Sequence, residues 1–283
     1  MLRYILHRVF MLVPVLFGVT LVAFFLLHLV PGDPAEILAG QEATKEDVDR
    51  IRVEYGLDKP LAVQYVRFVV SAAQGDLGIS IQSRHPVREL LFQRLAFTLQ
   101  LSLASILVAS AIGALAGIVS STRQYSIFDT ASMLGALFGI SMPIFWLGLL
   151  LILVFAVKLH WLPSGGTGGL RYLILPAIAL GSASAAVIAR MTRASMLEVT
   201  RQDYIRTARA AGYRESVVIF RHGLKNAMIP VLTVFGLEFG TMLGGAVLTE
   251  TVFALPGIGR LLVEGIFARD YPVIMAMTLL VAS

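Results

Sequence analysis

Residues 95–122 read LAFTLQLSLASILVASAIGALAGIVSST and contain no Lys, Arg, Asp or Glu. A transmembrane helix needs about 20 consecutive, mostly apolar residues to cross a hydrocarbon core about 30 Å thick. Two other stretches, 9–32 and 130–157, also lack all four charged residue types. Three such stretches are unexpected in a soluble domain with buried helices. The sequence therefore predicts an all-α protein that crosses the membrane several times.

Six transmembrane helices are predicted. Five are complete, at about residues 9–30, 95–120, 130–157, 172–194 and 228–249. A sixth begins near Pro272 and runs to Ser283. At about 1.5 Å per residue it covers only about 18 Å, so we expect it to be truncated or to need further residues. Pro143 should kink or break the third helix, and the backbone groups freed there must be buried in protein or line a cavity.

The composition agrees with this class, because 57% of the residues are hydrophobic and 14% are charged. Soluble domains are nearer a quarter charged. The first apolar run follows Arg3 and Arg8, as in a signal peptide. It is longer than a typical apolar region of about 7–15 residues, and Pro31–Pro34 offers no small-residue cleavage site. We therefore expect a retained first helix.

Positive charges indicate the orientation, because short cytoplasmic loops are enriched in Lys and Arg. The N-terminus carries Arg3 and Arg8, and segment 190–225 carries eight basic residues against three acidic ones. Both are predicted to be cytoplasmic, which accounts for the net charge of +5 without a nucleic-acid partner. Segment 32–94 is predicted to be outside, since long loops are largely exempt from this rule. The turn cluster Gly56–Pro60 and the amphipathic residues 61–68 predict a small folded cap there.

Glycines at a four-residue spacing occur in three of the predicted helices. They are Gly113 and Gly117, Gly135 and Gly139, and Gly236, Gly240 and Gly244. Such faces let helix backbones approach closely in lipid. The spacing predicts helix packing and does not name a function.

The residue types that carry enzyme chemistry are missing or scattered. The chain has no cysteine, and its five histidines show no metal-ligand spacing. It contains no Gly-x-Ser-x-Gly elbow and no Gly-x-x-x-x-Gly-Lys-Ser/Thr phosphate loop. We expect no catalytic site, no metal site and no ATP hydrolysis by this chain itself.

Glu238 lies within the fifth predicted helix. A carboxylate at that depth is costly and usually faces the bundle interior or an aqueous cavity. Gly236 and Gly240 flank it, so Glu238 should point away from the glycine face. The helix would then pack through its glycines and face a translocation path through Glu238, and Pro143 is a second candidate residue of that path. The alternative is a carboxylate that pairs with a neighbouring helix and never meets cargo.

Residues 203–212 read DYIRTARAAG and lie in the basic segment. Asp203 is a suitable N-cap, and Gly212 suits the left-handed position that follows many helices. About two helical turns lie between them, with Tyr204, Ala208 and Ala211 on one face. Small side chains on that face would allow close approach to another surface. The alternative is an ordinary solvated connector between the fourth and fifth spans.

This stretch resembles the "EAA" loop of binding-protein-dependent ABC permeases, which follows a Glu-Ala-Ala-three residues-Gly pattern. Arg206, Thr207 and Ala208 occupy the Glu-Ala-Ala place and Gly212 the glycine, so the first two positions depart from it. The form Tyr-Ile-x-Thr-Ala-Arg-Ala-x-Gly is characteristic of peptide and nickel permeases, which commonly have Lys in place of Ala211. The general pattern's Ile-x-Leu-Pro is absent at its usual distance.

Other stretches resemble the same family in the same order. They are Leu29–Ala35 (LVPGDPA), Tyr55–Leu61 (YGLDKPL), Gly75–Gly78 (GDLG), Glu250–Leu262 (ETVFALPGIGRLL) and Arg269–Pro272 (RDYP). Together they resemble the B-type permease of dipeptide, oligopeptide, glutathione and nickel importers, over essentially the whole chain.

The resemblance implies one type I importer permease domain over residues 1–283, in the bacterial inner membrane. Within it lie a periplasmic insert, 32–94, and a coupling loop, 195–227. The implied ATPase-coupling residues are Asp203, Tyr204, Arg206, Thr207, Ala208, Arg209, Ala210 and Gly212. The implied partners are a C-type permease, two ATPase subunits that use ATP and Mg, and a periplasmic or lipid-anchored binding protein.

The expected cargo is a di- or oligopeptide, with nickel or glutathione as alternatives. Two other classes stay open from the residues alone. An ion-coupled secondary transporter should show inverted repeats and paired broken helices, and the sequence has one marked break. A membrane-embedded enzyme should show a nucleophile or metal cluster within a span.

Overall fold

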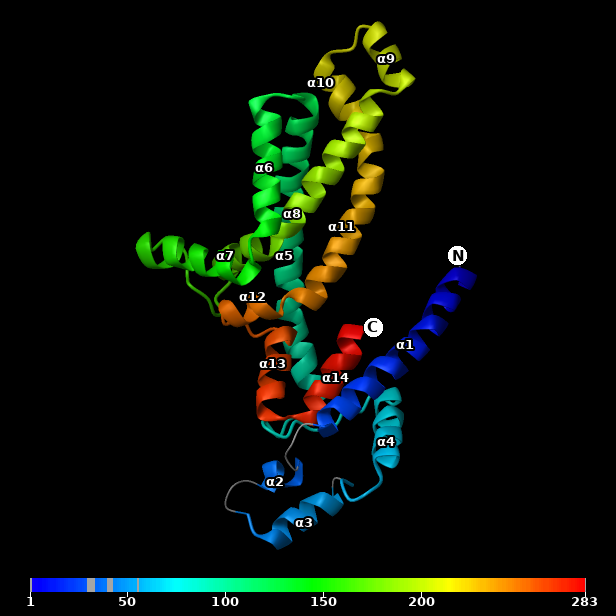
Figure 1. Ribbon diagram of the computed structural model, residues 1–283, viewed down its shortest axis with the longest axis vertical. Coiled ribbons are helices and arrows are strands. Elements are labelled where there is room, and N and C mark those ends of the chain that lie inside the picture. Colours follow the sequence, from blue (N-terminus) through cyan, green and yellow to red (C-terminus); the bar gives the residue numbers. More distant parts are fainter. Residues whose placement is uncertain (1, 30–33, 40–42, 55, 283) are drawn as a thin grey trace. The chain divides into compact units, whose positions relative to one another are not determined.

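The structure is a computed structural model and describes residues 2–29, 34–39, 43–54 and 56–282. Its described residues form helices and loops, with one isolated β-bridge between Ile79 and Pro86. Two compact units divide the chain (Figure 1). One comprises residues 1–96 and 260–283, and the other comprises residues 97–259. Helices α5 (Val87–Thr122) and α13 (Ile258–Ala268) contribute residues to both.

The first unit contains both ends of the described chain. Its other helices are α1 (Leu2–Leu29), α2 (Pro34–Ala39), α3 (Lys45–Glu54), α4 (Leu61–Ala73) and α14 (Tyr271–Ala282). Helix α1 packs against α14, and Phe24, Tyr65 and Met275 form a small core. The Ser80 hydroxyl donates to the Asp270 carboxylate over 2.5 Å, and both side chains are buried. This bond ties the loop before α5 to the start of α14, which begins where the sixth span was predicted.

The second unit is a bundle built around α8. Its elements are α6 (Ile127–Ser141), α7 (Ile144–Leu151), η1 (Ile152–Lys158), α8 (Leu170–Thr200), α9 (Asp203–Ala210), α10 (Glu215–Val217), η2 (Val218–Leu224), α11 (Lys225–Gly245) and α12 (Val247–Val252). Helices α6 and α11 both pack along α8 (Figure 1). The core includes Leu101, Leu175, Ile188 and Phe253.

Glycines bring α5 close to α8, as their spacing predicted. A Cβ added at Gly113 would lie 2.5 Å from the carbonyl oxygen of Ala185. One added at Gly117 would lie 2.5 Å from the Cβ of Thr192. By contrast, Gly236, Gly240 and Gly244 on α11 have no atom of the chain within 4 Å of an added Cβ. Their face is open in the isolated chain.

The third predicted span is broken and is not one continuous helix. Helix α6 ends at Ser141, and the chain turns by 104° before α7 and η1. Met142 is extended, as expected of a residue before proline, and Pro143 precedes the first turn of α7. The predicted break at Pro143 is confirmed, and by length and composition the bent pair passes the test for a span only as a pair.

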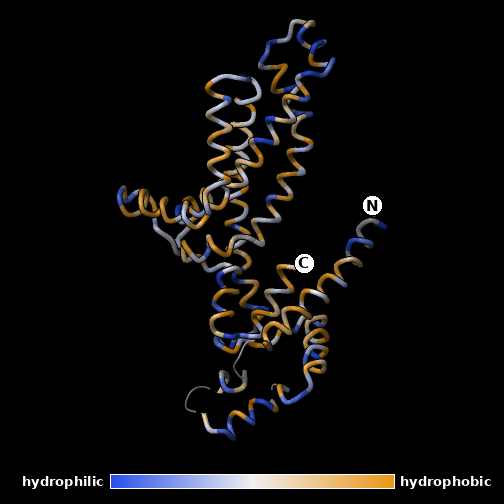
Figure 2. The backbone as a smooth tube through the Cα atoms, viewed as in Figure 1, coloured by the Kyte–Doolittle hydropathy of each residue, from blue (hydrophilic) through white to orange (hydrophobic). Residues whose placement is uncertain are grey.

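Four helices in the described residues are long and apolar enough to cross a membrane. They are Leu6–Leu29, Val87–Thr122, Leu170–Thr200 and Glu215–Gly244. The bent pair α6 and α7–η1 makes a fifth if it counts as one span. Figure 2 shows the apolar character of these helices and the hydrophilic residues of α9.

Candidate functional site

Helix α9 lies where a short helix was predicted, between α8 and α11. It spans Asp203–Ala210, and Gly212 follows with a φ of 79°, in the left-handed region as expected. The predicted Asp203 cap is wrong, because the N-cap position is Gln202 and its side chain makes no capping bond. Asp203 lies in the first turn and forms an exposed ion pair with Arg206 at 3.6 Å. A carboxylate there still favours the positive end of the helix dipole.

The face that α9 buries differs from the predicted one. Ile205 and Ala208 are buried and pack against Val218 of η2, with Val199 of α8 beside them. Tyr204 and Ala211 are exposed. Ile205 is the largest aliphatic side chain of the helix, so its burial sets the rotation, and Ala208 follows three residues later. Ala208 therefore packs against its own chain.

Polar contacts fix α9 to the elements around it. The Asn226 amide of α11 donates to the Tyr204 hydroxyl over 2.9 Å. The Arg209 guanidinium donates twice to Glu215 of α10, over 2.7 and 3.2 Å. These bonds from Glu215 raise the pKa of Arg209 above its usual range. Arg206 and Arg209, both implied as coupling residues, each pair with a carboxylate of their own loop in this chain.

Three exposed positions remain between these contacts. The Thr207 hydroxyl donates to the Asp203 carbonyl oxygen over 3.0 Å, and Ala210 and Ala211 present only methyl groups. With Tyr204 and the arginines, they form the outward surface of the loop. The inner side of the loop packs on Val218 and Val199, and the outward surface combines methyl groups with Tyr204 and the two arginines.

Glu238 points toward α8. Its Oε2 accepts a hydrogen bond from the Ser184 hydroxyl over 2.5 Å, and the side chain is half-buried. The glycines beside it face away from the described part of this chain, so Glu238 points away from the glycine face as predicted, although it contacts α8. This contact has the geometry of the packing alternative, since a carboxylate at that depth needs a donor. Whether Glu238 or Pro143 contacts cargo stays a prediction.

An ion pair that sequence reasoning missed joins α6 to α8. Arg193 donates to both oxygens of Asp129, each over 2.9 Å, and to the Ser120 hydroxyl over 2.8 Å. Ser120 also bonds to Asp129, and the Tyr125 backbone N–H donates to the same carboxylate. The only signal in the sequence was the position of Asp129 and Arg193 at the ends of apolar stretches. That position does not identify a partner.

Glu250 is a second buried carboxylate whose role the sequence did not reveal. It is 0% exposed, and the Thr98 hydroxyl of α5 donates to it over 2.6 Å. Thr98 in turn accepts from the Ile258 backbone N–H over 2.9 Å. A Cβ added at Gly257 would lie 2.1 Å from the Glu250 carboxylate, so only glycine fits there. Residues 250–258 therefore fold tightly around this carboxylate. Among the described residues, no cluster of three His, Asp or Glu side chains could hold a metal.

Comparisons with known proteins identify the family. Residues 109–283 match the model of the binding-protein-dependent transport system inner membrane component, and residues 1–102 match the model of its N-terminal region. The dipeptide transport system permease protein DppB of Alkalihalophilus pseudofirmus is 46% identical over 100% of this chain and 93% of its own. The glutathione transport system permease protein GsiC of Escherichia coli K12 is 47% identical over 99% of this chain and 92% of its own. The di/tripeptide permease DppB of Pseudomonas aeruginosa is 46% identical, with 100% and 93% covered.

Two solved structures share the fold. An amino acid ABC transporter crystallised with histidines has a TM-score of 0.53 at 14% identity, over 68% of this chain and 86% of that one. The inward-facing MetNI methionine ABC transporter has a TM-score of 0.54 at 20% identity, over 68% and 89%. These likenesses confirm the predicted type I importer fold. The chain belongs to the inner membrane components of binding-protein-dependent transport systems, the pore-forming permease subunits of ATP-driven importers.

Proposed function

We propose that this permease passes short peptides from an external binding protein to the cytoplasm. The observation that carries this is the similarity, over nearly the full chain, to permeases named for dipeptides, di/tripeptides and glutathione. Glutathione is itself a tripeptide, so all three names share a cargo with amide bonds and carboxylates. Nickel has a different chemistry and is the alternative that the test below must exclude.

We infer that α9 is the surface on which a partner ATPase docks. The chain has no phosphate loop of its own, so nucleotide-driven motion must reach it through a contact. Coupling requires an element whose position both sites bias. The burial of Ile205 against Val218 and Val199, and the Tyr204–Asn226 hydrogen bond, link α9 to both α8 and α11. A push on the outer side of α9 would therefore move two transmembrane helices together.

The same proposal sets the orientation and the partners. The N-terminus and residues 195–227 face the cytoplasm, and 32–94 is an insert on the outer side of one permease domain. A C-type permease completes the translocation path, two ATPase subunits use ATP and Mg, and a binding protein delivers cargo. The open glycine face of α11 supports a protein neighbour, because such faces favour close helix contacts.

The test is ATP hydrolysis by the reconstituted complex of this permease, its second permease, the ATPases and the binding protein. A dipeptide-loaded binding protein should stimulate hydrolysis, whereas nickel with the same protein should leave it at the basal rate. Stimulation by nickel and not by peptide would reject the peptide cargo, but the assignment as an ATP-driven importer would still hold. If the loaded binding protein does not stimulate hydrolysis, the proposed coupling between cargo delivery and ATP hydrolysis is rejected.

A further inference from the structure

Helix α4 exposes a row of apolar side chains, whereas several of its polar side chains lie on its buried or half-buried side. Val66 is 58% exposed and Val70 is 50% exposed, and Val63 and Val69 are exposed beside them. Gln64, Tyr65 and Ser71 lie on the buried or half-buried side. A helix on a water-exposed surface shows the opposite arrangement. The outward face of α4 is therefore not built for water.

Helix α3, which precedes α4 in the chain, is built for water. Seven of its ten residues are charged, and Asp49 and Arg52 form an exposed ion pair at 2.6 Å. Figure 2 shows the contrast between the hydrophilic α3 and the apolar α4. The segment predicted as one external cap thus contains two helices suited to different surroundings.

Helix α4 packs against the membrane-crossing part of α1. The Tyr65 hydroxyl donates to the Phe17 carbonyl oxygen over 3.0 Å and lies 3.0 Å from the Thr20 hydroxyl. The Phe17 and Tyr65 rings meet edge to face, 5.7 Å apart. Phe17 lies 29 − 17 = 12 residues before Leu29, the end of the apolar span. That is about 18 Å along a helix, near the middle of a hydrocarbon core about 30 Å thick.

The apolar surface of α1 continues onto α4. Phe17, whose carbonyl and ring contact Tyr65, is 53% exposed, and an extended run of apolar side chains along α1 is exposed with it. We infer that α4 is embedded in lipid, in the half of the membrane that contains the Leu29 end of α1, with Val63, Val66 and Val70 against acyl chains. At about 1.5 Å per residue its length is about 20 Å, too short to cross, so it enters and leaves on one side.

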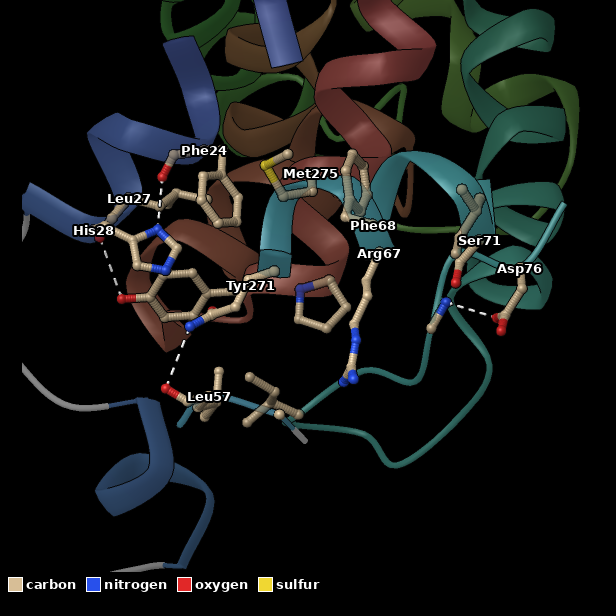
Figure 3. Close-up of a pocket in the computed structure, with 16 residues that line it drawn as sticks. Phe24, Leu27, His28, Leu57, Arg67, Phe68, Ser71, Asp76, Tyr271 and Met275 are labelled. Atoms are coloured by element: carbon tan, nitrogen blue, oxygen red, sulfur yellow. Dashed lines mark hydrogen bonds between the residues drawn. The ribbon is translucent and has the colours of Figure 1, made fainter. Parts of the chain in front are cut away.

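A helix in lipid must direct its polar groups to the membrane interface or satisfy them with hydrogen bonds, and Arg67 and Gln64 of α4 do so. Figure 3 shows Arg67 extending from α4 toward the turn that contains Leu57, and its guanidinium lies beside Gly56. Long basic side chains direct their charge to the membrane interface in this way. The Gln64 amide donates to the carbonyl oxygens of Leu57 and Lys59, so it too is satisfied at that turn. A cavity of about 290 Å³, lined by Phe24 and Phe68 among others, separates this turn from the end of α1.

The test uses single nitroxide labels, because the chain has no cysteine. Val66→Cys and Val70→Cys report on α4, Val13→Cys on α1 is the lipid reference, and Asp49→Cys on α3 is the water reference. The assembled importer is reconstituted in phosphatidylcholine and phosphatidylglycerol vesicles. Oxygen concentrates in hydrocarbon and a polar nickel chelate stays in water, so collisions with each report the surroundings.

The oxygen-to-nickel accessibility ratio at positions 66 and 70 should equal that at 13 and exceed that at 49 by about tenfold or more. A ratio like that at position 49 would place α4 in water and overturn the inference. Low accessibility to both reagents would show that a protein covers α4, and would overturn it as well. These outcomes do not depend on the cargo.

A matched pair of substitutions gives an independent result. Val70→Lys places a charge on the outward face of α4, and Val53→Lys places one on the exposed surface of α3. The first should reduce the amount of folded permease in the membrane severalfold, because a charge in hydrocarbon is costly, and the second should not. Equal amounts of the two variants would contradict a lipid-embedded α4.

Discussion

At the scale of single residues, the side chain of Ile205 sets which face of α9 is buried, and the predicted face did not include it. Tyr204, Ala208 and Ala211 share a face, but burying Ile205 removes more apolar surface than burying alanine. Ile205 and Ala208 therefore pack inward on Val218. Asp203 and Arg209 were likewise predicted from residue type alone. Arg206, the partner of Asp203, lies three residues along the same helix, whereas Glu215, the partner of Arg209, is reached only because the loop folds back after Gly212.

Tryptophan at positions 208 and 211 should act in different ways. Ala208→Trp overpacks the contact with Val218, at a cost of about 1–3 kcal/mol, and should make the loop sensitive to limited proteolysis. Ala211→Trp leaves the loop folded, because Ala211 is exposed, but should prevent co-purification of the ATPase. Ala211→Ser is the control. Normal ATPase binding by Ala211→Trp would mean that this surface is not the docking site.

The Arg209–Glu215 pair can be tested by exchanging its charges. Arg209→Glu should weaken the loop by about 0.2–1 kcal/mol, since the pair is exposed, and should lower cargo-stimulated ATP hydrolysis. Adding Glu215→Arg should restore most of the lost rate, as a double-mutant cycle requires of a direct pair. If the double variant is as impaired as Arg209→Glu alone, Arg209 has a second partner on the ATPase.

Glu250 should be needed for stability. Glu250→Ala leaves the Thr98 hydroxyl without its buried acceptor, so the free energy of unfolding should fall by about 1–3 kcal/mol. Glu250→Gln keeps an acceptor oxygen and should cost less, and Glu198→Ala at an exposed site is the control. Thermal unfolding in detergent measures all three. An equal Tm for Glu250→Ala and Glu198→Ala would contradict a structural role for the Glu250–Thr98 bond.

At the scale of elements, the sequence predicted which helices and breaks are present better than it predicted how the helices turn and which way their side chains point. Absence of charge over 95–122 identifies a span because the hydrocarbon core imposes its length, and Pro143 identifies a break because proline lacks an N–H. The turn of 104° that follows was not predictable, since it depends on how α7 packs against α8 and α12. Glu238 points away from its glycines, as predicted, but the sequence did not reveal which helix would meet the carboxylate. In the single chain, Ser184 holds the carboxylate and the glycines are open.

The end of α9 depends on the left-handed conformation of Gly212. No atom lies within 4 Å of a Cβ added there, so a substitution acts through the backbone and not through a clash. Gly212→Val should cost about 1–2 kcal/mol and reduce ATPase co-purification, whereas Gly212→Asn, which tolerates this conformation, should retain most of it. Equal retention by both variants would show that the turn geometry does not limit docking.

At the scale of the whole molecule, the two units carry different parts of the proposed activity. Residues 97–259 contain the bundle around α8, the loop proposed to meet the ATPase and the open glycine face of α11. Residues 1–96 and 260–283 contain α1, α14 and the helices between α1 and α5. An importer permease needs one surface for nucleotide-driven motion and another toward the cargo. We propose that the two units divide these roles.

The measurement that tests the central claim most directly is uptake of a labelled dipeptide into vesicles that contain the complete importer. ATP is supplied on the side of α9, the binding protein on the other side, and ionophores collapse all ion gradients. Uptake should require ATP, peptide and binding protein together, and should persist without any gradient. Uptake that continues without ATP and stops when the gradients collapse would contradict an ATP-driven permease.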